Sequence, residues 1–368
     1  MNLGTDLPRA DASRLVVYVL GAGVGESVVV AFPDGRHLVA DAACIGRDNL
    51  PAILLKGLGV GTIDLLVSTH PDLDHVRGLA KLVDDFSPVA LWRYPQDAAA
   101  RDFFVRWSED AGHTDLSDAL KAFDRHLSKT GATFDAAYGF RSWPTKPGPY
   151  KVVSLAPTPV DRDRAMRFWE KLITVRRGRA RLTKWCRQAA EGKTKVGDAP
   201  NVVSLALAIQ WLSHRVVLGG DVMRGLGRGP RASRSGWKGI LAHLEEDGLA
   251  GLVEDVSVVK VAHHGSKHSF ELTVWQRHSK SGRTVALLAP FQSGIPDEDT
   301  LRALRVHAEM LGIAKGSPTL DARAKKCGWS TAPAPHVVIS GDVPVAGAVL
   351  HADGKRETFG TRAASCWK

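Results

Sequence analysis

The chain has 368 residues, of which 44% are hydrophobic and 24% are charged, and its formal net charge is +10. This length is long for one domain, although single α/β folds reach it. The four cysteines are widely spaced, which excludes a disulfide framework and a zinc ribbon. No apolar run has the length of a membrane span, and the N-terminus lacks the features of a signal peptide. We therefore expect a cytoplasmic protein with no membrane partner.

The first ninety or so residues alternate between strand and helix patterns. Continuous apolar runs of this kind are typical of strands that are buried on both faces of a sheet. The predicted order is a strand near 17–20, a strand near 26–30, a turn at 33–35, a strand near 38–42, a helix over Leu50 to Leu58, a strand over Ile63 to Val67, a helix over Val76 to Phe86 and a strand over Val89 to Tyr94.

Four potential metal ligands follow the strand at Ile63 to Val67 within six residues. They are His70, Asp72, Asp74 and His75. Ligands gather at the carboxyl ends of strands in α/β sheets. We expect the first pair to share one face of the exiting turn and the second pair to open the next helix, so that each pair serves one of two adjacent divalent cations. The alternative is a polar turn in which an aspartate caps the helix.

Two later apolar strands also end in potential ligands. The run 216–220 leads into Asp221, and the run 256–262 leads into the segment His263-His264-Gly265-Ser266-Lys267. Taken alone, Asp221 could be a turn residue and the histidine pair could be structural. Three such strand ends in one chain favour a single shared site.

The middle of the chain contains a predicted helical insertion at residues 98–130. Its apolar residues recur at helical spacing, which indicates a face that packs on the sheets or covers the site. These residues are Phe103, Phe104, Trp107, Leu116, Leu120, Phe123 and Leu127.

Positive charge is concentrated in a second insertion, residues 171–195, which we call the basic segment. Nine basic residues and one acid, Glu191, give it a charge of +8. A further basic stretch follows Asp221. Clustered lysine and arginine are typical of proteins that bind a polyanion such as nucleic acid, and the alternative is a solvated loop. The candidate substrate-binding residues of the two stretches are Arg176, Arg177, Arg179, Arg181, Arg224 and Arg228.

The pattern is weaker beyond residue 290. It predicts a helix over Asp297 to Leu311. It also predicts a terminal hairpin that joins His336 to Ser340 with Ala346 to His351 around Gly341-Asp342.

Together, the three motifs resemble the metallo-β-lactamase superfamily. The resemblance is greatest to the metallo-β-lactamase-like domain of the DNA-uptake competence protein ComEC and to its stand-alone relatives. It covers about residues 14–290 and rests on the motif from Ser68 to Gly78, a strand at Asn201-Val202-Val203-Ser204-Leu205, the pair Gly220-Asp221 and the segment His263 to Lys267. It implies an α/β fold, a four-layer αββα sandwich, over a single domain at 14–368.

The chain departs from the common superfamily pattern at several positions. Asp72 stands where most members have histidine, and Asn201 stands near the position of another histidine. The competence-type branch also has aspartate and asparagine there. Gly21-Ala22-Gly23 replaces the usual aspartate near the first glycine turn, and the membrane segments of the uptake protein are absent.

The motifs lead to a hypothesis of two bound metal ions. We expect His70, Asp72, Asp221 and one of His263 and His264 to hold one ion, and Asp74, His75 and the same Asp221 to hold the other. The residues do not decide which histidine coordinates. The resemblance implies that one binds metal and the other faces substrate. Because Asp72 adds an oxygen donor, Mn²⁺ is expected to serve at least as well as Zn²⁺, with Mg²⁺ also possible.

The function that fits these features is a metal-dependent phosphodiesterase that cuts nucleic acid, DNA more than RNA. Asp74, Asp221, His264 and Lys267 are its candidate catalytic residues, and Ser266 and Lys267 could bind a phosphate oxygen. The alternatives are a hydrolase of a small phosphodiester, lactone or β-lactam, and an inactive nucleic-acid-binding module. A cytoplasmic nuclease would need restraint by a partner, a lid or an activating protease, and a role in defence against foreign DNA would fit.

Overall fold

The computed structural model describes most of the chain. The residues it does not describe are 2, 4–5, 22–24, 97–100, 102–103, 107, 110–111, 113, 131–132, 137–139, 147, 176–198, 226–232, 292–294, 331–335 and 362–363. The basic segment therefore lies almost entirely outside the described residues.

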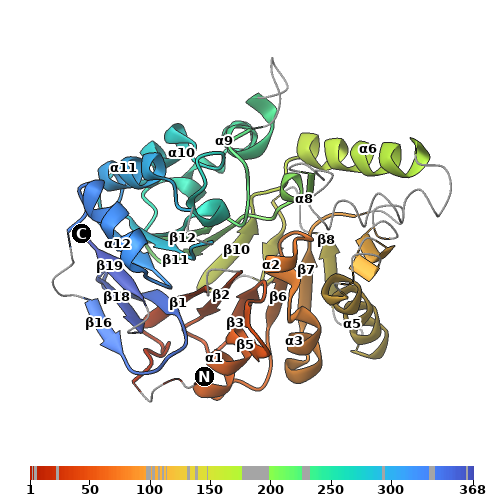
Figure 1. Ribbon diagram of the computed structural model, residues 1–368, viewed down its shortest axis with the longest axis horizontal. Helices are drawn as coiled ribbons and strands as arrows, with labels where there is room; N and C mark the ends of the chain where they lie inside the picture. The colour runs from red at the N-terminus through yellow and green to blue at the C-terminus, as the bar shows by residue number, and fades with distance from the viewer. Residues whose placement is uncertain are drawn as a thin grey trace.

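Two large sheets stack face to face in the described part of the chain (Figure 1). The nine-stranded sheet has the order β16 (His336–Ile339), β18 (Arg356–Thr361), β17 (Val345–His351), β1 (Arg14–Gly21), β2 (Glu26–Ala31), β3 (His37–Ala40), β6 (Leu65–Ser68), β7 (Ala90–Arg93), β8 (Thr133–Ala136). The eight-stranded sheet has the order β19 (Ser365–Trp367), β15 (Met310–Ile313), β14 (Val285–Leu288), β13 (Val258–Lys260), β12 (His214–Leu218), β11 (Leu207–Trp211), β10 (Tyr150–Ser154), β9 (Ser142–Trp143). Beside them, β4 (Cys44–Ile45) and β5 (Asp48–Asn49) form a small pair.

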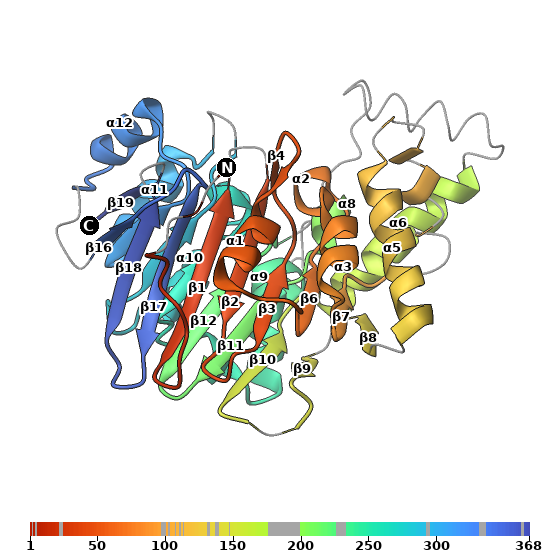
Figure 2. The same cartoon turned by 90° about the horizontal axis from the view of Figure 1, so that it is seen from below.

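Helices cover the outer face of each sheet, so the molecule has four layers (Figures 1 and 2). The nine-stranded sheet carries α1 (Leu50–Leu58), α3 (Leu79–Phe86) and α5 (Asp115–Thr130). The eight-stranded sheet carries α9 (Gly236–Glu246), α10 (Leu272–His278), α11 (Glu298–His307) and α12 (Pro318–Lys326). This is the αββα arrangement that we expected, and α1 has the predicted bounds. In the part of the chain that the structure describes, no helix is both long and apolar enough to cross a bilayer.

The alternating direction of side chains along a strand explains why the inner strands are apolar at every position. In β1, Val16 and Tyr18 belong to the core between the nine-stranded sheet and its helices. Their neighbours Leu15 and Val17 belong to the core between the two sheets. Successive side chains of a strand point to opposite faces, so a strand in an inner layer has two apolar faces.

The predicted insertion at 98–130 contributes to the outer layer. Helix α5 packs against α3, and its residues Leu116 and Phe123 are buried in the core beneath them. The helix links β7 to β8, which pair in parallel. It is therefore the crossover of a βαβ unit, and the strand β8 that ends the unit was not predicted.

The predicted C-terminal hairpin is wrong. Strand β17 pairs with β1 on one side and with β18 on the other, both antiparallel, while β16 pairs with β18 in parallel. The true hairpin is β17–β18. Long-range pairing with β1 fixes this arrangement, and a local turn signal at Gly341 does not report it. The predicted helix over Asp297 to Leu311 also ends early, because residues from Met310 onward form β15.

Two short helices stand near the ends of the inner strands. Asp74 and His75 lie in α2 (Leu73–Val76), and α3 begins only at Leu79. Asn201, which we expected in a strand, lies in α8 (Ala199–Val202). The longer α6 (Pro159–Val175) includes the first five residues of the basic segment.

Gly347 in β17 permits the close packing of three strands, and we predict that Gly347→Ala destabilises the fold. A Cβ at Gly347 would collide with the Phe359 ring and with the carbonyl oxygen of Val17. Overpacking of this kind costs about 1–3 kcal/mol of the free energy of unfolding. Urea unfolding of Gly347→Ala measures the loss. Gly61→Ala is the control, because a Cβ at Gly61 meets nothing within 4 Å. Equal stability of the two variants would contradict this view of the sheet.

Candidate metal centre

The polar ends of four strands meet at one edge of the sandwich. Asp41 follows β3 and His70 follows β6 in the nine-stranded sheet. Asp221 follows β12, and the pair His263 and His264 follows β13 in the turn η3 (Ala262–Gly265) of the eight-stranded sheet. The structure therefore brings the three predicted motifs together.

Asp221 lies at the centre of this group and faces it with both carboxylate oxygens. Its Oδ2 lies 3.6 Å from Nε2 of His70 and 3.6 Å from Nε2 of His263. Its Oδ1 lies 3.5 Å from Nε2 of His75. The Ser204 hydroxyl accepts the backbone N–H of Asp221 at 2.8 Å. The preceding Gly220 has φ +50°, and a Cβ there would collide with Leu205, so glycine is required for this turn.

On one side of Asp221, three side chains form the His70 half-site, which we define as His70, Asp72 and His263. The Asp72 carboxylate lies 3.6 Å from Nε2 of His70. Asp72 is at the N-cap position of α2, yet its side chain accepts no capping hydrogen bond from that helix. Its carboxylate is turned toward His70, so the alternative interpretation of this aspartate as a helix cap does not hold.

On the other side of Asp221 lies the His75 half-site, which we define as Asp74, His75 and His264. The Oδ2 atom of Asp74 lies 3.7 Å from Nε2 of His75 and 3.2 Å from Nε2 of His264. The two half-sites are adjacent, because the centroids of the His70 and His75 rings lie 4.1 Å apart. Each half-site thus offers two imidazole nitrogens and one carboxylate of its own, and both share Asp221.

The Nδ1 atom of each histidine faces away from Asp221, and its hydrogen bond determines whether Nε2 can bind a metal ion. Nδ1 of His75 donates to the Asp41 carboxylate at 2.7 Å, and Nδ1 of His264 donates to the Ala289 carbonyl at 3.0 Å. The Thr69 hydroxyl donates to Asp41 and therefore accepts from Nδ1 of His70 at 2.9 Å. A ring with its proton on Nδ1 presents an Nε2 lone pair.

Nδ1 of His263 is in contact with the Ser269 hydroxyl at 3.2 Å, and that hydroxyl donates to Met223. All four Nε2 atoms thus face the centre, where each can give its lone pair to a cation that replaces the proton.

This donor set could hold metal ions, and the ligand atoms of Asp74, His75 and His264 all lie within 4.8 Å of one another. Nε2 of His70, Nε2 of His75 and Oδ1 of Asp221 are buried and have no hydrogen-bond partner among the described residues. Buried polar atoms without partners are costly, and a cation bound between them would satisfy all three. Asp41 and Glu26 also lie within reach of these rings, but Asp41 bonds Thr69 and His75 and Glu26 pairs with Lys260.

The electrostatics of the centre favour positive charge. Burial would raise the pKa of Asp221, but the neighbouring His75 and His70 hold that pKa well below its ordinary value. Burial would likewise lower the pKa of His75, but Asp221, Asp74 and Asp41 raise it well above its ordinary value. The Asp221 carboxylate therefore stays ionised and attracts protons or cations to the imidazoles.

Several residues of this centre were not identified from the sequence. Asp41 and Thr69 orient His75 and His70, and Ser269 contacts His263. Glu26 and Lys260 form a buried ion pair behind His264. The sequence contains one indication of this pair. Lys260 is the only charged residue in the apolar run 256–262, and a charge in a buried strand needs a partner.

The predicted substrate-binding residues are only partly described. The Lys267 side chain is exposed, while its backbone N–H donates to Asp297. Ser266 is buried, and its hydroxyl accepts the backbone N–H of His268. Arg224 forms an ion pair with Glu271 at 2.8 Å. The remaining predicted residues lie outside the described part of the chain, and they are Arg176, Arg177, Arg179, Arg181 and Arg228.

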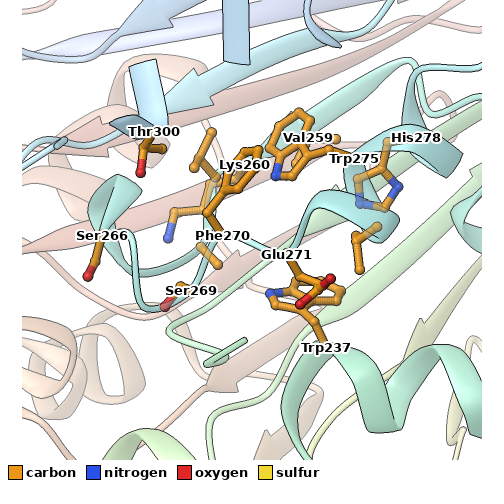
Figure 3. Close-up of a pocket in the computed structure, with 13 residues that line it drawn as sticks. Trp237, Val259, Lys260, Ser266, Ser269, Phe270, Glu271, Trp275, His278 and Thr300 are labelled. Atoms are coloured by element: carbon orange, nitrogen blue, oxygen red, sulfur yellow. The ribbon is translucent and has the colours of Figure 1, made fainter. Parts of the chain in front are cut away.

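The cavity in Figure 3 is too small to bind substrate. Its volume is about 10 Å³, and it lies between β13, the turn η3 and α10. That volume is about the space of one water molecule. Its lining includes Lys260, Ser269 and the aromatic residues Trp237, Phe270 and Trp275. The cavity therefore belongs to the layer that supports the histidine pair.

A family model described as Metallo-beta-lactamase superfamily matches residues 20–165. The match includes the motif from His70 to His75 and ends before Asp221. The two-sheet architecture is consistent with the metallo-β-lactamase sandwich fold, as the sequence predicted. No curated protein matches the chain.

Solved structures resemble the chain at low sequence identity. The metallo-beta-lactamase fold protein YhfI from Bacillus subtilis is 15% identical, with a TM-score of 0.41, over 83% of this chain and 98% of that one. CmlA, a diiron beta-hydroxylase from Streptomyces venezuelae, is 13% identical, with a TM-score of 0.34, over 78% of this chain and 46% of that one. A metallo-beta-lactamase from Cronobacter sakazakii is 13% identical, with a TM-score of 0.31, over 66% of this chain and 73% of that one.

We predict that His263→Ala and His264→Ala each reduce the bound metal from two ions per chain to one, because each histidine faces a different half-site. Elemental analysis after dialysis against Mn²⁺ or Zn²⁺ measures the ratio. His243→Ala is the control, because His243 bonds the Gly239 carbonyl in α9, outside the centre. Two ions retained in His263→Ala would mean that this histidine faces substrate instead.

Proposed function

We propose that the chain is a metal-dependent hydrolase that cleaves the phosphodiester bonds of nucleic acid, DNA more than RNA. The position of Asp221 between the His70 half-site and the His75 half-site carries the proposal. A carboxylate shared in this way can hold two cations close together, and such a pair can act on the attacking and leaving oxygens of one phosphodiester. The match to the Metallo-beta-lactamase superfamily model supports a metal-dependent hydrolase as the class.

Two bound divalent cations would supply an activated water and would stabilise negative charge on the attacking and leaving oxygens. The residues of the chain hold and surround that chemistry. Asp221 fixes the two half-sites relative to each other, and Asp72 and Asp74 add one oxygen donor to each. Carboxylate oxygens favour Mn²⁺ and Mg²⁺ more than an all-imidazole set does. Lys267 follows the histidine pair with an exposed ammonium that can neutralise charge developing on phosphate.

The nucleic-acid part of the proposal rests on charge. The basic segment carries +8 of the net +10. The basic stretch after Asp221 contributes less than its sequence indicated, because Arg224 pairs with Glu271 and Arg234 pairs with Glu246. We therefore assign the main phosphate contacts to the basic segment, most of which lies between α6 and α8 in the chain.

We predict that the metal-loaded protein cuts labelled single- or double-stranded DNA in Mn²⁺, and that Asp74→Ala abolishes the cutting. Asp74 faces two imidazoles of the His75 half-site, so its loss removes an ion. Gel analysis in Mn²⁺, Mg²⁺ and Zn²⁺, with RNA in parallel, measures the activity and the metal preference. Asp84→Ala is the matched control, because Asp84 is an exposed aspartate of α3.

The same assay tests the rival hydrolase of a small substrate. A variant with Arg176, Arg177, Arg179 and Arg181 changed to glutamine should cleave DNA much more slowly and with a smaller dependence on salt, while cleavage of bis-p-nitrophenyl phosphate stays unchanged. If the intact metal-loaded protein cuts only the small diester, and Asp74→Ala abolishes that reaction too, the nuclease proposal fails and the rival stands.

A further inference from the structure

The two half-sites differ in the groups behind their imidazoles. In the His75 half-site both rings have a carboxylate behind Nδ1. Asp41 accepts from His75 at 2.7 Å. Nδ1 of His264 donates to the Ala289 carbonyl, and the Oε2 atom of Glu26 lies 3.2 Å from that nitrogen without a hydrogen bond, so Glu26 acts on this ring through its charge. A carboxylate behind a ligating histidine makes the opposite nitrogen a stronger donor to a metal ion.

In the His70 half-site both rings have a neutral hydroxyl behind Nδ1. Thr69 is in contact with His70 at 2.9 Å, and Ser269 is in contact with His263 at 3.2 Å. Asp41 reaches His70 only through the hydroxyl of Thr69. The rings of this half-site therefore receive a weaker electrostatic contribution from their surroundings than the rings of the His75 half-site.

A buried lysine holds Glu26 in this position. Lys260 pairs with Oε1 of Glu26, and its Nζ also donates to the Gly220 carbonyl at 3.2 Å, one residue before Asp221. Glu26 belongs to β2 and Lys260 to β13, so the pair joins the two sheets beneath the centre. Both residues are buried. A lone carboxylate at that depth would destabilise the fold, and the pair with Lys260 offsets part of that cost.

Solvent exposure differs in the same sense. In the His75 half-site, the side chains of His75 and His264 are 0% and 2% exposed, and Asp74 is 22% exposed. In the His70 half-site, His70 is 0% exposed, but His263 is 23% exposed and Asp72 is 30% exposed. The main difference is therefore between the two histidines His263 and His264. Water competes with ligands and screens charge more strongly where access is greater.

We infer that the two half-sites bind cations in a fixed order: the His75 half-site, supported by Asp41 and by the Glu26–Lys260 pair, is the tight site and fills first, and the His70 half-site binds an exchangeable ion. The inference rests on the proposed binding of two divalent cations at this centre. Glu26, Lys260 and Asp41 act as positioning residues, since they act through the histidines. The tight ion would stay with the protein, while the supply of the second ion would determine whether the centre is complete.

Isothermal titration of the metal-stripped full chain with Mn²⁺ tests the order. The wild type should show two binding steps of different affinity. Glu26→Gln combined with Lys260→Met removes both charges and leaves no unpaired ion in the core, and Asp41→Asn is an independent variant in case the double variant does not fold. Each should weaken the tight step by roughly 10–100-fold, and the double variant should leave the weak step unchanged. Asp41→Asn should weaken the tight step more than the weak one, because Asp41 reaches His70 only through Thr69.

Ser269→Ala is the opposite control, because it should weaken only the second step. A single step of equal sites in the wild type, or a change confined to the weak step in the Glu26 and Asp41 variants, would overturn the inference. DNA cleavage by the same samples keeps the two claims separate. Ordered binding without cleavage would leave the inference standing and reject the nuclease, while cleavage with two equal sites would do the reverse.

Discussion

The shared carboxylate of Asp221 is the interaction on which the rest of the centre depends. It follows a strand of one sheet, yet the three histidines whose Nε2 atoms lie within 3.6 Å of it come from both sheets. His70 and His75 follow β6 of one sheet, and His263 follows β13 of the other. The position is possible because Gly220 makes the turn and Ser204 accepts the Asp221 N–H. The stacked sheets therefore serve as a scaffold that brings histidines from two sheets within 3.6 Å of one carboxylate.

Placing so much negative charge at a buried edge requires compensation. Asp72, Asp74 and Asp221 face inward, and Asp41 and Glu26 stand behind the histidines. Within the described residues, Lys260 is the buried cation nearest this group, and it neutralises only Glu26. Bound divalent cations would balance the negative charge of the remaining aspartates. The cluster of buried carboxylates is therefore the feature that connects the structure to the proposed metal-dependent chemistry.

Much of the centre was predictable because its ligands are close in the sequence. The spacing of His70, Asp72, Asp74 and His75 fixes a turn and the start of a helix, and α2 has that form. The roles of His263 and His264 could not be predicted, because they depend on left-handed backbone angles, φ +49° and +55°, that send the two rings to different half-sites. Asp41 and Glu26 were missed as site residues because their partners lie 34 and more than 200 residues away.

The difference between local and long-range contacts also explains which parts of the fold could be predicted. Helix α1 was predicted correctly because its start is local, with Asn49 accepting the N–H of Ala52 at the first turn. The C-terminal strands were misassigned because β17 pairs with β1, at the other end of the chain. The charge of the basic stretch after Asp221 was overestimated, since the acids that neutralise it come from α9 and from the residue before α10.

The most direct test of the account is anomalous diffraction from crystals loaded with Mn²⁺. We expect two anomalous peaks, one for each metal ion, about 3.5–4 Å apart, which is the usual separation in two-metal centres. One should lie among His70, Asp72 and His263, the other among Asp74, His75 and His264, with Asp221 between them. A single peak, or two peaks that do not share Asp221, would contradict it.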